Sequence, residues 1–211
     1  GKGTRALEVA NRLAYRYLDS GALYRVTGLA MSRAGFAATP ESEARIAQIA
    51  RELPLDFSTG RVMLGDEDVT EAIRSEAAGM DASRVSGLPA VRQALVELQK
   101  RFRRLPGLVA DGRDMGTVIF PGAALKVFLT ASAAERAERR HKQLISKGIS
   151  ATLDSLRSDL EARDARDSSR SVAPLKPAHD ARHLDNSQLS IAQSIDQVLA
   201  WWQQVQPFES A

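Results

Sequence analysis

Short apolar segments separated by helical stretches constrain the fold of this chain more than any other feature. Leu108-Val109-Ala110 and the segment from Leu125 to Leu129 are brief runs rich in strand-forming residues. Further strand candidates lie at 15–18 and near 182–185. Strands in the middle of a parallel sheet are short and apolar because helices cover both of their faces. We therefore predict an α/β fold in which 108–110 and 125–129 are buried strands of a parallel sheet.

Helical periodicity fills the stretches between these strands. Leu7, Ala10 and Leu13 have the spacing of one helix face. The last helix opens with a capping box, in which a serine and a glutamine three residues later bond each other's backbone. The predicted helices are 3–15, a second carrying Leu23 to Met31 before Gly35, a third opened by Thr39-Pro40, one opened by Pro89, two highly charged helices at 132–146 and 152–168, and a last one opened by Ser190-x-x-Gln193.

A different pattern interrupts this series between residues 54 and 86. Leu55, Phe57, Val62 and Leu64 alternate with polar residues around Thr59-Gly60. Strict alternation around a turn signal is typical of an antiparallel hairpin, and Asp68-Val69 continues it. Because antiparallel patterning breaks a parallel α/β order, we interpret 54–86 as an insert.

Composition limits the classes of function. The chain has 211 residues, enough for one sizeable domain with a small insert, and 44% of its residues are hydrophobic. It has no cysteine, and its three histidines lack metal-ligand spacing. The net charge is only +3, and no apolar run approaches the ~18 residues of a membrane span. We expect a cytoplasmic monomer with neither a nucleic-acid nor a membrane partner.

The first four residues, Gly1-Lys2-Gly3-Thr4, match the second half of a phosphate-binding loop. The full loop reads G-x-x-x-x-G-K-[ST], in which glycines let backbone N–H groups converge on a phosphate and a lysine reaches the β- and γ-phosphates. Alone, this tetrapeptide is a weak signal. Its function depends on whether the rest of the chain offers partners for a nucleotide.

Two of the predicted strands end in polar clusters that contain glycine. Asp19-Ser20-Gly21, followed by Tyr24-Arg25, comes after the first strand, and Asp111-Gly112-Arg113-Asp114 comes after the strand at 108–110. Ligands of open α/β sheets bind at the carboxyl ends of the strands. A single cluster is as easily an ordinary capped turn, but two clusters together with Gly1-Lys2-Gly3-Thr4 indicate a ligand site.

Rows of arginine lie along the two charged helices. Arg136, Arg139 and Arg140 share one helix face, and Arg163, Arg166, Asp167 and Arg170 share another. Like charges at this spacing are unfavourable in an isolated helix, whereas guanidinium groups suit phosphate oxygens. For the first row, phosphate binding and a solvated face balanced by acidic neighbours both stay open. For Arg163 and Arg170 we favour phosphate binding, because the helix ends there in a polar loop.

Taken together, these motifs resemble those of the bacterial cytidylate kinases, P-loop kinases that phosphorylate CMP and dCMP. The D-G-R-D-M-G-T-V-x-F-P run is highly specific, the D-S-G-A-x-Y-R run is nearly so, and an enlarged insert such as 54–86 is a further family feature. The matching stretches follow the family's order and are Gly1 to Thr4, Leu18 to Arg25, Ala82 to Val85 with Val91-Arg92, Ala110 to Pro121, Arg163 to Asp167, and Arg170 to Leu175.

The resemblance implies an ATP site at the start of the chain. Lys2 would bridge the ATP phosphates, Gly1 and Gly3 would donate backbone N–H groups, and Thr4 would hold Mg²⁺ through the phosphates. Arg136 and Arg140 match arginines of a helical lid, here 135–170, that covers ATP. The implied catalytic residues are Lys2, Arg113, Arg140 and Arg170.

The resemblance also implies a CMP site. Asp114 can accept a hydrogen bond from the exocyclic amine of cytosine, while Ser83 and Arg92 can address acceptor atoms of the ring. Arg113 suits the CMP phosphate and alternatively pairs with Asp111 or Asp114. The implied CMP-binding residues are Ser20, Arg25, Ser83, Arg92, Arg113, Asp114, Arg163, Asp167 and Arg170, with Arg163 and Asp167 at the pentose and Arg25, Arg113 and Arg170 at the phosphate.

The expected fold is thus a single P-loop kinase-type domain over 1–211, with a parallel sheet flanked by helices, an antiparallel nucleotide-binding insert at 54–86 and a helical lid. We expect the natural protein to begin about 15 residues earlier, with an apolar strand and the rest of the loop. If that strand is central, a chain without it is inactive. The alternatives are an adenylate- or shikimate-type kinase and a P-loop protein that binds nucleotides without catalysis.

Overall fold

The computed structural model describes residues 2–57, 61–146, 148, 150–169 and 174–205. The chain forms two compact units, one of residues 6–112 and one of residues 113–211 together with the first five residues. The helix α1 (Lys2–Leu13) contributes residues to both. The expectation of one domain over 1–211 therefore stays a prediction.

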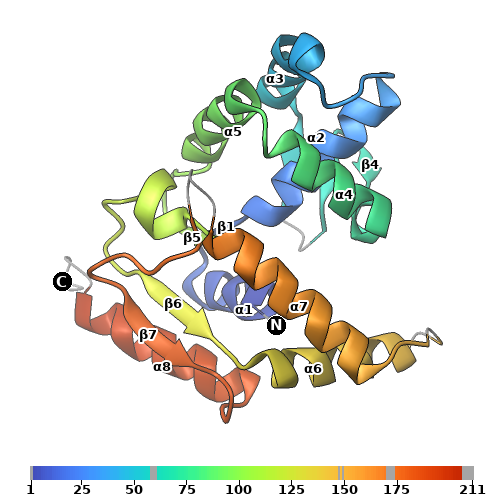
Figure 1. Cartoon of the computed structure of the whole chain (residues 1–211). Helices are drawn as coiled ribbons and strands as arrows, with labels where there is room; N and C mark the ends of the chain where they lie inside the picture. The colour runs from blue at the N-terminus through green and yellow to red at the C-terminus, as the bar shows by residue number, and fades with distance from the viewer. Residues whose placement is uncertain (1, 58–60, 147, 149, 170–173, 206–211) are drawn as a thin grey trace. The chain divides into compact units, whose positions relative to one another are not determined.

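The unit of residues 6–112 contains one parallel strand pair and several helices. β1 (Arg16–Asp19) runs parallel to β5 (Leu108–Asp111), and Asp19 lies opposite Asp111 in the register. The helix α3 packs on α5, and α2 packs on α4 (Figure 1). Fully buried apolar side chains such as Leu23, Ile46 and Leu95 form the core between them. The helix bounds are α2 Ser20–Arg33, α3 Glu43–Glu52, α4 Glu76–Val85 and α5 Pro89–Arg101.

The segment 54–86 has the antiparallel strands that its alternation predicts. β2 (Leu55–Asp56), β3 (Met63–Leu64) and β4 (Glu67–Asp68) form an antiparallel sheet in that order. Between β3 and β4, Gly65 adopts a positive φ of 60° that a side chain would disfavour. The 3₁₀ turn Ala72–Arg74 and the helix α4 follow the sheet. Sequence reasoning did not predict α4, and the turn signal Thr59-Gly60 lies outside the described residues.

A glycine sets the close packing of α2 on α4. A Cβ atom added to Gly28 would lie 2.7 Å from Cβ of Asp81 and 3.1 Å from its carbonyl carbon. Real Cβ atoms do not approach each other this closely, so only glycine allows the two helices to meet here. The packing of α2 and α4 determines where the side chains at the start of α2 lie.

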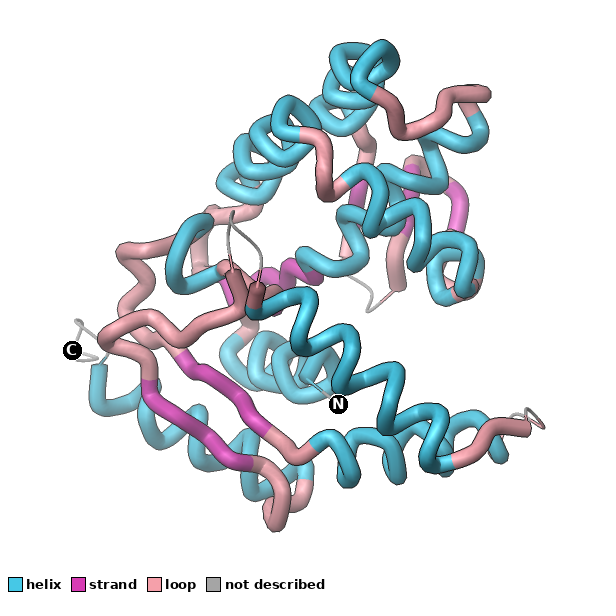
Figure 2. The backbone as a smooth tube through the Cα atoms, viewed as in Figure 1, coloured by secondary structure: helices cyan, strands magenta, loops and turns pink. Residues whose placement is uncertain are grey.

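The second unit contains another parallel pair and a helical hairpin. β6 (Val127–Thr130) runs parallel to β7 (Arg182–Asp185), and Figure 2 shows the two strands side by side. Arg182 of β7 packs over the ring of Trp201 in the last helix and bonds Gln204 at 2.7 Å. The helix α6 packs on α7, and the hydroxyls of Ser132 and Thr152 cap their first turns. The helix bounds are α6 Ala133–Ile145, α7 Leu153–Ser168 and α8 Ile191–Val205.

The prediction that 108–110 and 125–129 are buried strands is wrong in one respect. The strands exist and pair in parallel, but Leu108 to Ala110 and Val127 to Leu129 are only half-buried. Within the described residues, each of these strands pairs with one neighbour. Part of their apolar surface therefore contacts solvent. The capping box at Ser190 is confirmed, since its backbone N–H donates to Gln193 at 2.9 Å and its Oγ accepts from Gln193 N at 3.1 Å.

Candidate functional site

The carboxyl ends of β1 and β5 bring two predicted clusters to one edge. Asp19 and Asp111 are opposite each other in the parallel register, so the residues that follow both strands begin at the same place. Asp19 also caps α2, because its Oδ1 accepts a hydrogen bond from Ala22 N at 3.0 Å. Ser20 begins α2 and is buried. The prediction that these strand ends meet is confirmed.

Tyr17 lies on β1, two residues before Asp19. The sequence did not indicate that it belongs to this site. Burial raises the pKa of its phenol, and the negative charges of Asp19 and Asp111 raise that pKa further. The hydroxyl therefore stays protonated at neutral pH, as a neutral donor close to two carboxylates. No local sequence signal marks Tyr17, because its environment depends on the pairing of β1 with β5.

The insert fixes the orientation of Arg25. Its Nη1 donates to the carbonyl oxygen of Ile73 at 2.8 Å and to that of Ser75 at 3.4 Å. Gly79, in the first half of α4, lies against the same guanidinium, since a Cβ there would stand 3.4 Å from both terminal nitrogens, at van der Waals contact. A guanidinium has five N–H donors, and these two bonds use one of its nitrogens to fix the orientation of the group.

Arg92 and Tyr24 form a second contact at α2. The guanidinium carbon of Arg92, on α5, lies 5.8 Å from the centre of the Tyr24 ring. This is the geometry of a cation–π contact, which fixes the orientation of the guanidinium. Ser20 and Arg25 lie on α2, and Tyr24 of the same helix contacts Arg92. The helix α2 thus connects three side chains that are predicted to bind CMP. Ser83 lies on α4 with an exposed side chain.

In the other unit, the start of α1 lies close to α6. Lys2 and Thr4 are exposed on the first turn of α1, whereas Arg5 is only 7% exposed. Burial lowers the pKa of Arg5, and the positive charge of Arg139 on α6 lowers it further. The two charges are therefore near each other, which brings Lys2 and Thr4 to the side of the arginine row. Gly1 lies outside the described residues.

The three arginines of α6 differ in their partners. Arg139 donates to the backbone oxygen of Asn186 at 2.9 Å, which ties α6 to the end of β7. Arg136 forms a two-pronged pair with Asp164 of α7, with 3.0 Å between Nη1 and Oδ1. Arg140 is exposed and forms no hydrogen bond or ion pair within the described residues. Of the row, Arg140 alone combines exposure with an unengaged charge.

The second arginine row lies on α7 and just beyond it. Arg163 and Asp167 belong to α7, whose backbone is described while these two side chains are not. Arg170 lies outside the described residues. The pentose and phosphate contacts expected of these three residues therefore stay predictions.

Asp114 begins an unusual turn. Its carbonyl oxygen accepts from Val118 N at 2.8 Å and from Ile119 N at 3.2 Å, and Met115–Ile119 forms a single π-helical turn. Such turns are rare and occur often at functional sites. Asp114 is 8% exposed, and Arg113 before it is half-buried. Burial of a carboxylate is costly unless it accepts hydrogen bonds. The Asp114 carboxylate, at the start of this turn, is therefore suited to bind a hydrogen-bond donor.

The side chain of Lys126 packs against this turn. The sequence did not indicate that Lys126 belongs to the site. Its side chain is 7% exposed, and its Nζ lies 2.8 and 2.9 Å from the two carboxylate oxygens of Asp180. A Cβ on Gly116 would stand 3.1 Å from Cδ of Lys126, so the turn packs directly on the lysine stem. The lysine therefore limits the positions that the backbone after Asp114 can adopt.

These features define a class of protein. An α/β chain with parallel strands flanked by helices, a small antiparallel sheet, and arginines next to the first turn of α1 has the P-loop kinase fold. The sequence model of the cytidylate kinase family matches residues 1–204, and the chain belongs to that family. In the described part of the chain, no helix is both long and apolar enough to cross a membrane.

Similar proteins support the same assignment. The cytidylate kinase of Cupriavidus necator is 54% identical over 207 residues, which is 98% of this chain and 92% of that protein. The cytidylate kinase of Ralstonia pickettii is 53% identical over 98% of this chain and 88% of its own length. That of Chromobacterium violaceum is 53% identical, with 98% and 92% covered. The match of the family model to residues 1–204 includes every predicted site segment.

Proposed function

We infer that this protein transfers the γ-phosphate of ATP to CMP or dCMP, which gives CDP or dCDP and ADP. It is an ATP-dependent (d)CMP kinase, a phosphotransferase whose acceptor is itself a phosphate group. The observation that carries this function is the match of the cytidylate kinase family to residues 1–204. The adenylate- and shikimate-type alternatives and the non-catalytic alternative lack such support.

On the donor side, we propose that the first turn of α1 binds the phosphates of ATP. Gly1, Lys2 and Gly3 would contact phosphate oxygens, with help from the positive end of the helix dipole. The exposed hydroxyl of Thr4 is the kind of hard oxygen ligand that Mg²⁺ accepts. The magnesium ion enters as part of the MgATP substrate, where it neutralises phosphate charge.

The α6–α7 hairpin is the proposed lid. Arg140 is available to an incoming phosphate, whereas Arg136 would have to leave Asp164 or share it. A lid that closes over both substrates excludes water, which would otherwise receive the phosphoryl group. The lid over 135–170 and the insert over 54–86 thus serve the donor and the acceptor, respectively.

The proposed acceptor site reads both ends of CMP. Arg25, Arg113 and Arg170 contact the CMP phosphate, and Arg25 reaches it from an orientation that the carbonyls of Ile73 and Ser75 set. Asp114 accepts from the cytosine amine, and Arg92, oriented by Tyr24, addresses the ring. Uracil has an acceptor in place of that amine, so it would offer no donor to the buried carboxylate of Asp114. Ser20 and Ser83 bond the nucleotide, and Arg163 and Asp167 bond its pentose.

The chemistry follows from position and charge. An oxygen of the CMP phosphate attacks the γ-phosphorus of ATP, while the bond to the β–γ bridging oxygen breaks and ADP leaves in line. Lys2, Arg113, Arg140 and Arg170 offset the negative charge that the two phosphate groups bring together. No side chain has to form a covalent bond. We further propose that the protein acts as a cytoplasmic monomer.

An acceptor panel tests this function. The initial rate of ADP release from ATP is measured on the full-length protein with CMP, dCMP, UMP, AMP and shikimate. We expect CMP and dCMP to give the highest kcat/KM values. A higher value for UMP, AMP or shikimate would contradict the assignment, and ADP release that does not depend on any acceptor would indicate a nucleotide hydrolase.

A further inference from the structure

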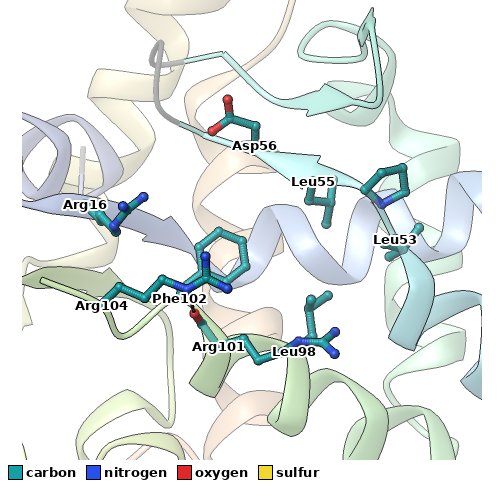
Figure 3. A pocket seen from close by; sticks show the side chains of 9 residues that line it. Arg16, Leu53, Leu55, Asp56, Leu98, Arg101, Phe102 and Arg104 are labelled. Carbon is teal, nitrogen blue, oxygen red and sulfur yellow. Dashed lines mark hydrogen bonds between the residues drawn. The ribbon is translucent and has the colours of Figure 1, made fainter.

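A cavity in the unit of residues 6–112 lies apart from the proposed acceptor side chains. Its volume is about 360 Å³, and Arg16, the first residue of β1, contributes to its wall. Ser20 follows the other end of β1, about 13 Å from Arg16 at the rise of a strand. The segment after α3 and the end of α5 complete the wall (Figure 3). None of the residues that line it belongs to the ATP or CMP sites proposed above.

The cavity is strongly cationic. Arg16, Arg101 and Arg104 line it, against the single carboxylate of Asp56. Arg101 donates to the backbone oxygen of Arg51 at 2.8 Å, and Arg104 donates to that of Arg101 at 3.1 Å. Within the described residues, none of the three forms an ion pair, and the side chain of Arg16 forms no hydrogen bond. Their mutual repulsion favours a bound anion.

The rest of the wall is apolar. Leu53 and Leu98 are buried, and Phe102 is half-buried beside them. The Phe102 ring contacts Phe57, with 5.6 Å between ring centres and a tilt of 48°, which fixes the orientation of its face. A volume near the lower end of the range for small-molecule sites suits a ligand with one planar group.

We propose that this cavity is a second nucleotide site, which binds a nucleoside polyphosphate. Its phosphates contact the guanidinium groups of Arg16 and Arg104, which come from different elements and can each offer paired N–H donors. Its base lies against the Phe102 ring and the two leucines. Inorganic pyrophosphate would use the arginines alone, so comparing the two ligands separates recognition of a phosphate from recognition of a nucleotide.

The end of α5 offers a simpler explanation for part of the cluster. Cations are favoured at a helix C-terminus. Arg104 bonds the carbonyl of Arg101 at the end of α5, and Arg101 bonds that of Arg51 in the last turn of α3. That explanation does not extend to Arg16, which lies on a strand. It predicts that removing Arg104 lowers the melting temperature and leaves nucleotide binding unchanged.

Calorimetric titration of the full-length protein with ATP and with pyrophosphate tests the proposal. We expect two ATP per chain, one at the donor site and one at the cavity. In the double variant Arg16→Gln, Arg104→Gln, the second should bind at least about tenfold more weakly, as expected for lost charged hydrogen bonds. Arg103→Gln is the matched control, because Arg103 is exposed and does not line the cavity. It should bind both ATP molecules.

The outcomes separate this proposal from the function itself. CMP phosphorylation by the double variant should keep its kcat at saturating substrate, because no proposed catalytic residue changes. One ATP per wild-type chain would overturn the second site, and so would equal losses in the double variant and in Arg103→Gln. Pyrophosphate that binds the cavity as tightly as ATP would overturn its assignment to a nucleotide.

Discussion

The two units hold their key arginines in different ways. In the unit of residues 6–112, Arg25 bonds two backbone carbonyls, and Arg92 lies over the Tyr24 ring. On α6, Arg136 is paired with the carboxylate of Asp164, while Arg140 is exposed and unengaged within the described residues. A carbonyl or an aromatic ring fixes the orientation of a cation, whereas a carboxylate partner competes with a phosphate for it.

From this difference we propose that the acceptor side is oriented in advance and that the donor side responds to its ligand. Arginines that are already aimed need little reorganisation when CMP binds. On the proposed lid, Asp164 pairs with Arg136 when no ATP is bound, and Arg140 would contact a phosphate of ATP once it binds. The following predictions test this contrast, from the largest expected effect to the smallest.

Replacement of Lys2 should have the largest effect. Lys2→Ala is expected to lower kcat/KM for ATP by about 10³-fold, because a preorganised charge on the transferred phosphate is lost. Initial-rate kinetics with saturating CMP measures this. Arg12→Ala, an exposed cation of the same helix that is paired with Glu8, is the control and should retain most of the activity. Retention of more than a tenth of the activity in Lys2→Ala would be inconsistent with the donor site.

Arg140→Met should lower kcat by about 10²-fold, since its charge is proposed to act on the transferred phosphoryl group. Its matched control is Lys142→Met, an exposed cation of the last turn of α6. The control should retain wild-type kcat. Similar losses in both variants would show that charge on α6, rather than the position of Arg140, is what matters.

Asp114→Ala separates the two substrates. We expect it to raise the Kd of CMP at least about tenfold, because a buried charge-assisted hydrogen bond to the cytosine amine is lost. ATP binding should change far less. Binding of each nucleotide to the free protein, followed by calorimetry, measures both. Equal weakening of CMP and ATP would argue against a cytosine-reading role.

Gly28→Ala tests the packing that brings α4 to α2. The new Cβ would stand 2.7 Å from Cβ of Asp81, so the helices must move apart. Overpacking of this kind typically costs about 1–3 kcal/mol of unfolding free energy. Gly122→Ala, where a Cβ meets nothing within 4 Å, is the control. Urea denaturation should show destabilisation in the first variant only, and comparable midpoints would remove the close approach as a constraint.

Arg136→Met should have the smallest effect. Because Arg136 is already paired with Asp164, its loss is expected to change the KM for ATP by about threefold, within the range of a partly exposed ion pair. Steady-state kinetics beside Arg140→Met measures the difference. A loss as large as that of Arg140→Met would mean that the ion pair does not persist in the ATP-bound state.

Much of the fold could be predicted because it depends on local patterns. The short strands, the charged helices and the capping box at Ser190 follow from residue type and spacing alone. The helix α4 was missed because Gly79 and the polar residues around it weaken the apolar periodicity of 76–85. The π-helical turn was missed because Thr117, Val118 and Ile119 are β-branched and favour a strand. The burial of 108–110 was wrong because it depends on which neighbours pair with it.

The candidate site divides in the same way. Clusters contiguous in the sequence, such as Asp19-Ser20 or Arg113-Asp114, could be identified from glycine and charge near a strand end. Partners distant in the sequence could not: Asp164 for Arg136, Ile73 for Arg25 and Asp180 for Lys126 meet only after folding. These partners decide which of several equivalent arginines keeps its charge available, so the sequence indicates the set of cations but not their individual states.

Separate binding of ATP and CMP to Arg25→Met and Arg140→Met tests the central contrast most directly. Each Kd is measured by calorimetry with one nucleotide alone. We predict a crossed result: Arg25→Met weakens CMP at least about tenfold and leaves ATP nearly unchanged, and Arg140→Met does the reverse. If either variant weakens both nucleotides equally, the two regions do not serve separate substrates, and the account is wrong.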